Sequence, residues 1–167
     1  MTLFMKSLLV RNSSSSSFGG RLILSTRKKF LAPGGILAQV ADGLKPQYRR
    51  EKARMDAMLY QPVNGCRAIS VAIEHEHNAE TAQNEAWRLS LLNSPLKVLV
   101  TYPEYGEGAL LLNSYATVLE AVDTFRDFHK FRRQLVVFGF SEYSAKSIEW
   151  QYYLYSRAGF TRCEVTA

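Results

Sequence analysis

The alternation of apolar and polar positions in the middle of the chain predicts a β-hairpin. Extended, largely apolar segments at residues 54–60 and 68–76 flank residues 61–65, where Pro, Asn and Gly are typical of a turn. We therefore expect a hairpin over residues 56–76. Such a hairpin brings the start of its first strand next to the end of its second.

Helical spacing of apolar residues follows the hairpin. Asn78 is expected to cap a helix that ends near residues 93–95, and residues 96–102 predict a buried strand. Strand, helix and strand in this order form a βαβ unit with a right-handed crossover. The remaining predicted elements are a helix over 114–131 with Val118, Val122 and Phe125 on one face, a strand over 134–140, and a last strand over 148–155. The fold class is therefore α/β, with a mixed central sheet and flanking helices.

The first thirty residues differ from the rest of the chain. They contain six Lys or Arg and no acid, and a run of serines spans residues 13–17. This composition predicts a basic, Ser-rich flexible tail over residues 1–30, ahead of an α/β domain over residues 31–167 that opens with a short helix near 34–44. A basic, Ser-rich and acid-free segment also fits an organelle-targeting peptide.

Composition changes this picture little. A chain of 167 residues with 47% hydrophobic and 12% aromatic residues predicts one folded domain, and no apolar run is long enough to cross a membrane. Cys66 and Cys163 have neither metal-ligand spacing nor the pattern of a disulfide framework. We expect reduced thiols and a cytoplasmic location, unless residues 1–30 direct the chain to an organelle.

Charge adds a candidate partner. The net charge is +6, but residues 1–60 hold 11 Lys or Arg against 3 acids, whereas residues 61–167 hold 10 against 12. A basic extension beside an acidic site attracts polyanions, of which nucleic acid is the commonest. The alternative is a solvated tail that aids solubility.

The candidate chemistry lies in the hairpin. Glu74 and Glu76 are two residues apart at the end of a strand and therefore share one face of the sheet. Pairing Tyr60 with Ala68 places Asp56 opposite Ala72 and diagonally from Glu74, whereas a register slipped by one residue moves Asp56 to the other face. Three neighbouring acids repel one another unless a proton or cation neutralises them, so they predict a divalent metal site.

Two histidines near these acids suggest a different metal. His75 and His77 alternate with the acids and so fall on the opposite face of the sheet. Zinc commonly takes three or four ligands, often with Cys, so we expect histidines that pack against a helix or lie on the surface. A zinc site remains the alternative.

The order of these residues resembles the PD-(D/E)XK nuclease superfamily, over roughly residues 34–102. Asp56 stands at the position of the family's hairpin aspartate, Glu74 at the (D/E) position, and Glu76 where the family usually has lysine. Glu51 matches an extra acid upstream. The resemblance implies a restriction-endonuclease-like core, Mg²⁺ or Mn²⁺ held by Asp56, Glu74 and Glu76, and hydrolysis of phosphodiester bonds in DNA by an endonuclease. A chain of this size has little room for a separate sequence-reading module, so specificity would come from a homodimer or from a partner.

The missing lysine leaves two readings open. Some relatives recruit a basic residue from the next helix. Here Arg88 lies one turn after Glu85 and can stabilise a phosphate. Glu85 or Glu76 can accept a proton or hold a second ion. Lys97 is expected on the order of 16 Å from the acids along the strands. The alternatives are a catalytically inactive relative that binds nucleic acid or other proteins, and a protein whose acids only decorate its surface.

Overall fold

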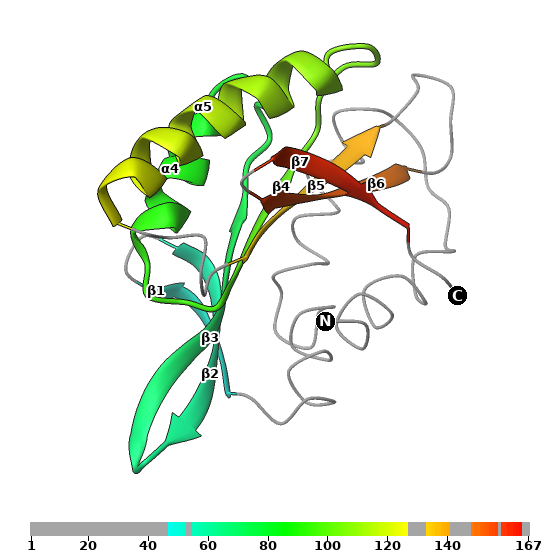
Figure 1. The fold of residues 1–167 in the computed structure, drawn as a ribbon. Helices are drawn as coiled ribbons and strands as arrows, with labels where there is room; N and C mark the ends of the chain where they lie inside the picture. Colours follow the sequence, from blue (N-terminus) through cyan, green and yellow to red (C-terminus); the bar gives the residue numbers. More distant parts are fainter. Residues whose placement is uncertain (1–46, 53–54, 127–132, 141–147, 157, 165–167) are drawn as a thin grey trace.

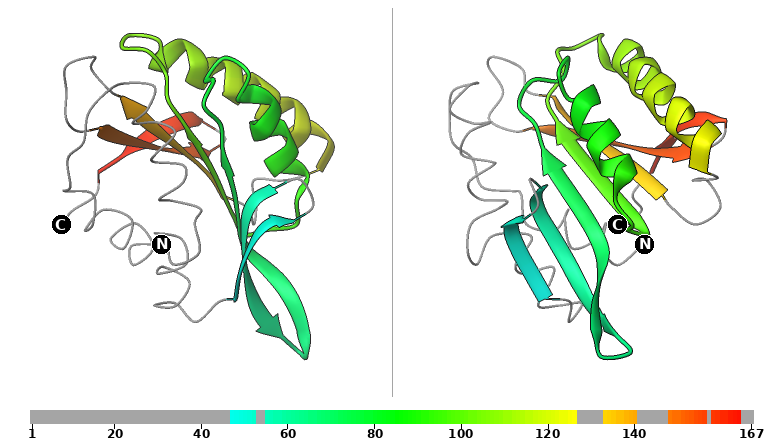
Figure 2. Two further views of the ribbon diagram at one scale, coloured as in Figure 1. Left: turned by 180° about the vertical axis from the view of Figure 1, so that it is seen from behind. Right: turned by 90° about the vertical axis from the view of Figure 1, so that its left-hand side faces the viewer.

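A single mixed sheet organises the chain, as the computed structural model shows (Figure 1). The structure describes residues 47–52, 55–126, 133–140, 148–156 and 158–164. Within them the sheet has seven strands in sequence order: β1 (Gln47–Lys52), β2 (Met55–Val63), β3 (Cys66–His75), β4 (Leu96–Thr101), β5 (Arg133–Phe140), β6 (Glu149–Ser156) and β7 (Gly159–Cys163). Helices α4 (Gln83–Leu91) and α5 (Gly108–Arg126) pack on one face of this sheet (Figure 2).

Parallel strands occupy the centre of the sheet and antiparallel strands its two sides. β3, β4 and β5 are parallel, with α4 joining the first pair and α5 the second. β1 and β2 extend the sheet antiparallel on one side, and β6 and β7 do so on the other. The predicted α/β class, mixed sheet and hairpin are confirmed.

A two-residue turn and a bulge set the hairpin register. Asn64 and Gly65 have φ of 49° and 76°, the positive values that a tight hairpin turn requires. Val63 therefore pairs with Cys66, and the register then shifts between Leu59 and Tyr60. Ser70 is the extra residue of this bulge, and its Oγ donates to the carbonyl oxygen of Leu59 at 3.0 Å.

The expected register was wrong by two residues, yet it had the correct face. Tyr60 pairs with Ile69, one residue from the expected Ala68, because the turn is tighter than residues 61–65 suggested. The bulge adds a second shift of one, so Ala57 pairs with Ile73 and the next position brings Asp56 opposite Glu74. One slip reverses the faces of a strand and a second restores them. The bulge at Ser70 is therefore what keeps Asp56 on the face of Glu74.

The main core lies between the sheet and the two helices. α4 contributes Ala86 and Leu89, which pack against Ala72 and Leu99 of the central strands. Where the burial of α5 residues is described, Leu111, Tyr115 and Leu119 are the buried ones. Val118 and Val122 of the expected face are partly buried, and the side chain of Phe125 lies outside the described residues.

Several element boundaries differ from those expected. α4 begins at Gln83, because Asn78 Oδ1 accepts from the Glu80 backbone N–H at 2.9 Å and forms a separate turn before the helix. α5 begins at Gly108, six residues before the expected start. β7 follows β6, which was wrongly taken as the last strand, and β1 was not predicted as a strand of its own.

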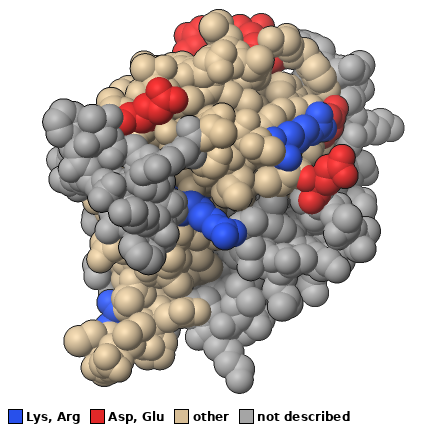
Figure 3. Space-filling view, in the orientation of Figure 1, with Lys and Arg blue, Asp and Glu red and all other residues tan. Residues whose placement is uncertain are grey.

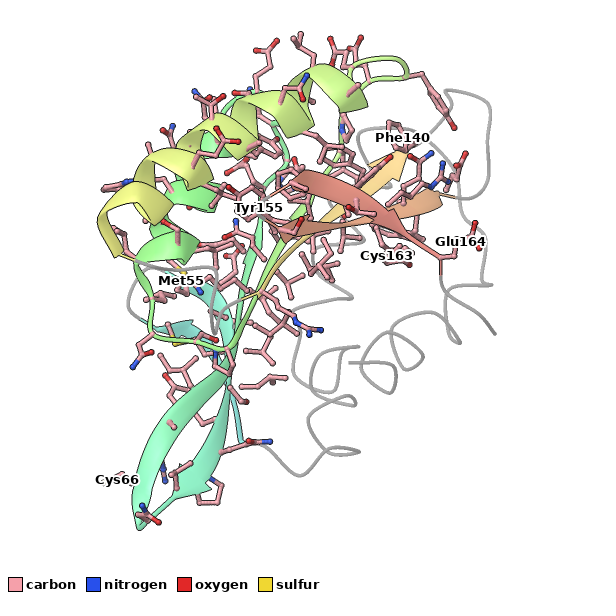
Figure 4. The ribbon with its side chains drawn as sticks, viewed as in Figure 1. Met55, Cys66, Phe140, Tyr155, Cys163 and Glu164 are labelled. Atoms are coloured by element: carbon pink, nitrogen blue, oxygen red, sulfur yellow. The ribbon has the colours of Figure 1, made fainter. Side chains whose placement is uncertain are left out.

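Some expectations concern parts of the chain outside this description. The basic tail over residues 1–30 and the helix near 34–44 both lie outside the described residues. No helix in the described ranges combines the length and apolar character needed to cross a membrane. Cys66 and Cys163 are free thiols, and Figure 4 shows them at the hairpin tip and near the opposite edge of the sheet.

Candidate functional site

Asp56 and Glu74 face each other on β2 and β3, beneath the helices. The Asp56 backbone N–H donates to Glu74 Oε2 at 3.2 Å, and the His75 backbone N–H donates to Asp56 Oδ2 at 2.9 Å. Each carboxylate therefore accepts a bond from the other strand's backbone. The two residues lie one step beyond the last strand pair, Ala57 and Ile73, and the effect of the Asp56 charge on the pKa of Glu74 is consistent with neighbouring carboxyl groups.

Glu74 is the most perturbed acid of this pair. Only 5% of the residue is exposed, and its Oε1 has no hydrogen-bond partner among the described residues. Burial is the main cause that raises its pKa, from 4.5 to about 8, and repulsion by the Asp56 carboxylate is the second. At neutral pH without a cation, Glu74 therefore carries a proton.

Glu85 reaches the same site from α4. Its carboxylate is the second acid, after Asp56, whose proximity raises the pKa of Glu74. Glu85 Oε2 also accepts from Arg88 Nη1 at 2.9 Å, so the expected pairing of these two residues on one helix face is confirmed. The Arg88 side chain is 44% exposed, which leaves its guanidinium accessible at the edge of the site.

Glu76 lies apart from the other acids. Its backbone N–H continues the pairing with β4 by donating to the Val100 carbonyl at 2.9 Å, and its Oε1 accepts from the Asn78 N–H at 3.0 Å. Its charge is the second cause, after burial, that raises the pKa of Tyr115 on α5. Glu76 is not among the groups that perturb Glu74. The structure thus groups Glu74 with Asp56 and Glu85, and it turns Glu76 toward α5.

Lys97 lies much nearer to the acids than expected. It pairs with Ala72, two residues before Glu74, because β4 starts beside the middle of β3 rather than beside its beginning. Two residues of strand correspond to roughly 7 Å instead of 16 Å. Lys97 is 2% exposed, and its Nζ donates to the Ser94 carbonyl at 3.0 Å.

Gln134 is a neighbour that the sequence reasoning missed. It pairs with Lys97 across β4 and β5, is 5% exposed, and its Nε2 donates to the Ala86 carbonyl of α4 at 3.4 Å. Lys97 and Gln134 are thus buried polar neighbours on adjacent strands, two residues before the level of Glu74 along the sheet. The available signal was a polar residue at the second position of each of two mostly apolar strands.

The histidines occupy the other face, as strand alternation predicted. His75 is 2% exposed, and its Nε2 lies 2.8 Å from the Tyr102 hydroxyl. The rings of His77 and Trp150 pack around Tyr102. His75 is therefore buried among aromatic rings, which corrects the expectation that it packs against a helix or lies on the surface.

Glycine at position 139 makes room for this aromatic group. A Cβ there would lie 2.8 Å from the Tyr102 ring and 2.9 Å from the Trp150 ring.

The upstream acid, Glu51, lies in β1. It takes the register position opposite Asp56, between the pairs Arg50–Ala57 and Lys52–Met55.

The acids offer a divalent cation two carboxylates rather than a complete set of ligands. No group of three His, Cys, Asp or Glu side chains within the described ranges is arranged as a ready metal centre. Mg²⁺, however, usually takes one or two carboxylates and completes its shell with water and substrate phosphate. The paired carboxylates of Asp56 and Glu74, with a buried Oε1 that lacks a partner, fit that requirement.

Comparison with known proteins does not assign the chain to a family. No protein-family model matches the sequence, and no curated protein matches it either.

Proposed function

We propose that this protein is a metal-dependent nuclease of the PD-(D/E)XK type that hydrolyses phosphodiester bonds in DNA. One observation carries the proposal: the buried carboxyl group of Glu74 lies beside those of Asp56 and Glu85, and both neighbours raise its pKa. Gathering three acids at a buried place costs free energy, and a purely structural role gives no reason for it. A bound divalent cation would offset that cost.

The roles of the residues follow from their positions. Asp56 and Glu74 would hold a Mg²⁺ or Mn²⁺ ion, which when bound supplies an acidified water and polarises the phosphate. Glu85, beside Glu74, would accept the proton of the attacking water. Arg88, held by Glu85 and partly exposed, would contact a phosphate oxygen of the substrate.

A non-cutting relative is the second candidate, and a specific observation favours it. Glu76 stands where the resemblance would place lysine, and the nearest buried lysine, Lys97, donates to the Ser94 carbonyl. Such a protein would bind DNA or another protein without hydrolysing it. Calorimetry with Mn²⁺ separates the two, because a live site binds the ion and a degenerate one does not.

Plasmid cleavage tests the proposal. Supercoiled DNA is incubated with the full chain and Mg²⁺ or Mn²⁺, with EDTA as the reference. We expect nicked and linear products only with metal, and a loss on the order of a hundredfold or more for Asp56→Asn and Glu74→Gln. The matched control is Glu80→Gln, an exposed acid in the turn after β3. Cleavage that persists in EDTA, or in both site variants, would contradict the assigned roles.

A further inference from the structure

The far end of the β2–β3 ribbon leaves the sheet entirely. We call residues 61–68 the hairpin arm; every residue in it is exposed. β1 pairs no further along β2 than Tyr60, and β4 begins opposite Val71, so neither described neighbour flanks the arm. Figures 1 and 2 show it projecting beyond the body of the molecule. A two-stranded ribbon alone in water is only marginally stable, so the stability of the fold gives no reason for an arm of this length.

The edges of the arm are protected against pairing with another strand. Val63 and Cys66 flank the two-residue turn and form a hydrogen-bonded pair. The next pair, Pro62 and Arg67, is therefore non-hydrogen-bonded, and its backbone N–H and C=O groups point away from the partner strand. Proline has no N–H to offer on its edge. The bulge at Ser70 disturbs the other edge. The arm is therefore suited to present side chains rather than backbone.

Three side chains of the arm can donate hydrogen bonds, and none is acidic. Gln61, Asn64 and Arg67 are exposed, and the segment contains no Asp or Glu. Val63 is 50% exposed and adds an apolar contact near the tip. Figure 3 shows no acidic surface on the arm, in contrast to the upper part of the molecule. This chemistry is complementary to phosphates and base edges.

We propose that the hairpin arm enters a groove of duplex DNA. The major groove of B-DNA admits a two-stranded β-ribbon, and Arg, Asn and Gln are the side chains that pair with base edges there. This inference rests on the proposed function, because the same ribbon carries Asp56 and Glu74 at its other end. Cys66 and Glu74 are eight residues apart, or roughly 27 Å along the strand, which equals about eight base pairs of duplex.

A shortened arm tests this proposal without touching the site. Removal of two cross-strand pairs, Gln61–Ala68 and Pro62–Arg67, keeps the turn, the hydrogen-bonding alternation and the bulge, because strands repeat every two residues. Duplex affinity of the full chain is measured in EDTA, so that cleavage does not enter. We expect a loss of about tenfold for this variant. For Arg67→Ala we expect a salt dependence lower by about one phosphate contact.

The matched control is Arg162→Ala, an exposed arginine on β7 at the opposite edge of the sheet, which should leave affinity and salt dependence unchanged. Unchanged affinity in the shortened variant would overturn the proposal. Dissociation of a dimer on shortening, seen by sedimentation without a loss of DNA binding, would also overturn it, since the arm would then join two copies.

Hydrolysis of bis(p-nitrophenyl) phosphate with Mn²⁺ reports on the acids separately. If the wild type fails there, the nuclease proposal fails, while the affinity comparison still decides the role of the arm.

Discussion

Glu74 and His75 are consecutive residues at the end of β3 that are buried to a similar degree and lie in opposite environments. Their exposed fractions are 5% and 2%. On one face, His75 Nε2 is satisfied by the Tyr102 hydroxyl within a group of aromatic rings. On the other face, Glu74 Oε1 has no partner among the described residues, and two nearby acids repel its charge.

This difference separates a structural polar residue from a candidate functional one. The His75 ring lies among aromatic rings and bonds to the Tyr102 hydroxyl. Glu74 instead lies beside the carboxyl groups of Asp56 and Glu85, and the repulsion of its charge leaves a free-energy cost that a cation would remove. His75 contacts both faces of the sheet. Its backbone N–H donates to the Asp56 carboxylate on one face, and its ring bonds to the Tyr102 hydroxyl on the other.

The largest effect is expected from deletion of Ala57, which separates the two carboxylates. The residue that then precedes Met58 is Asp56, so Asp56 would come opposite Ile73 and project from the other side of the sheet. We expect loss of metal-dependent cleavage and of several kcal/mol of stability, about 3 or more, because the buried start of β2 changes faces as well. Thermal unfolding and plasmid cleavage measure both. The shortened arm is the control, since it removes hairpin residues without changing the pairing of Ala57; equal stability and cleavage after Ala57 deletion would show that Asp56 need not face Glu74.

A smaller effect is expected on the histidine face from Tyr102→Phe. It leaves the buried His75 Nε2 without its partner, which costs about 1–3 kcal/mol. Denaturant unfolding measures the loss. Tyr152→Phe is the matched control, because the Tyr152 hydroxyl forms no hydrogen bond to another described residue. Equal stability of the two variants would mean that the His75–Tyr102 contact contributes nothing.

The carboxylate face should show itself in the pH dependence of stability. Without metal, folded Glu74 keeps its proton up to a pKa of about 8, whereas unfolded Glu74 releases it above 4.5. The stability should therefore fall as the pH rises between these values, by at most about 1.4 kcal/mol per pH unit and by less with solvent screening. Glu74→Gln should remove this slope. A variant whose stability follows the same pH profile as the wild type would refute the raised pKa.

The smallest effect is expected from Arg88→Ala at the edge of the site. The Arg88–Glu85 pair is partly exposed and lies within one helix, so its loss should cost no more than about 0.5 kcal/mol. If Arg88 contacts the phosphate, KM for DNA should rise while the unfolding midpoint stays nearly constant. A fall in stability of several kcal/mol would instead assign Arg88 a structural role.

The sequence allowed the fold to be predicted better than the site. Apolar periodicity and turn residues were enough for the hairpin, the central strands and the face of Glu74, because these depend on local patterns. The register of Asp56 depended on the Ser70 bulge, which leaves no periodic signal. Lys97 was misplaced because the starting level of β4 along β3 is a property of the packed sheet. The orientation of Glu76 toward Asn78 was equally nonlocal, since it depends on how the chain enters α4.

The most direct test of the account is Mn²⁺ binding to the full chain, measured by calorimetry near pH 7.5. Asp56 and Glu74 should provide one site, and binding should release close to one proton per ion, because Glu74 is protonated before the ion arrives. Glu80→Gln should bind equally well and Glu74→Gln should not. Equal binding by the wild type and Glu74→Gln, or no binding by the wild type, would contradict the claim that these two carboxylates form a metal site.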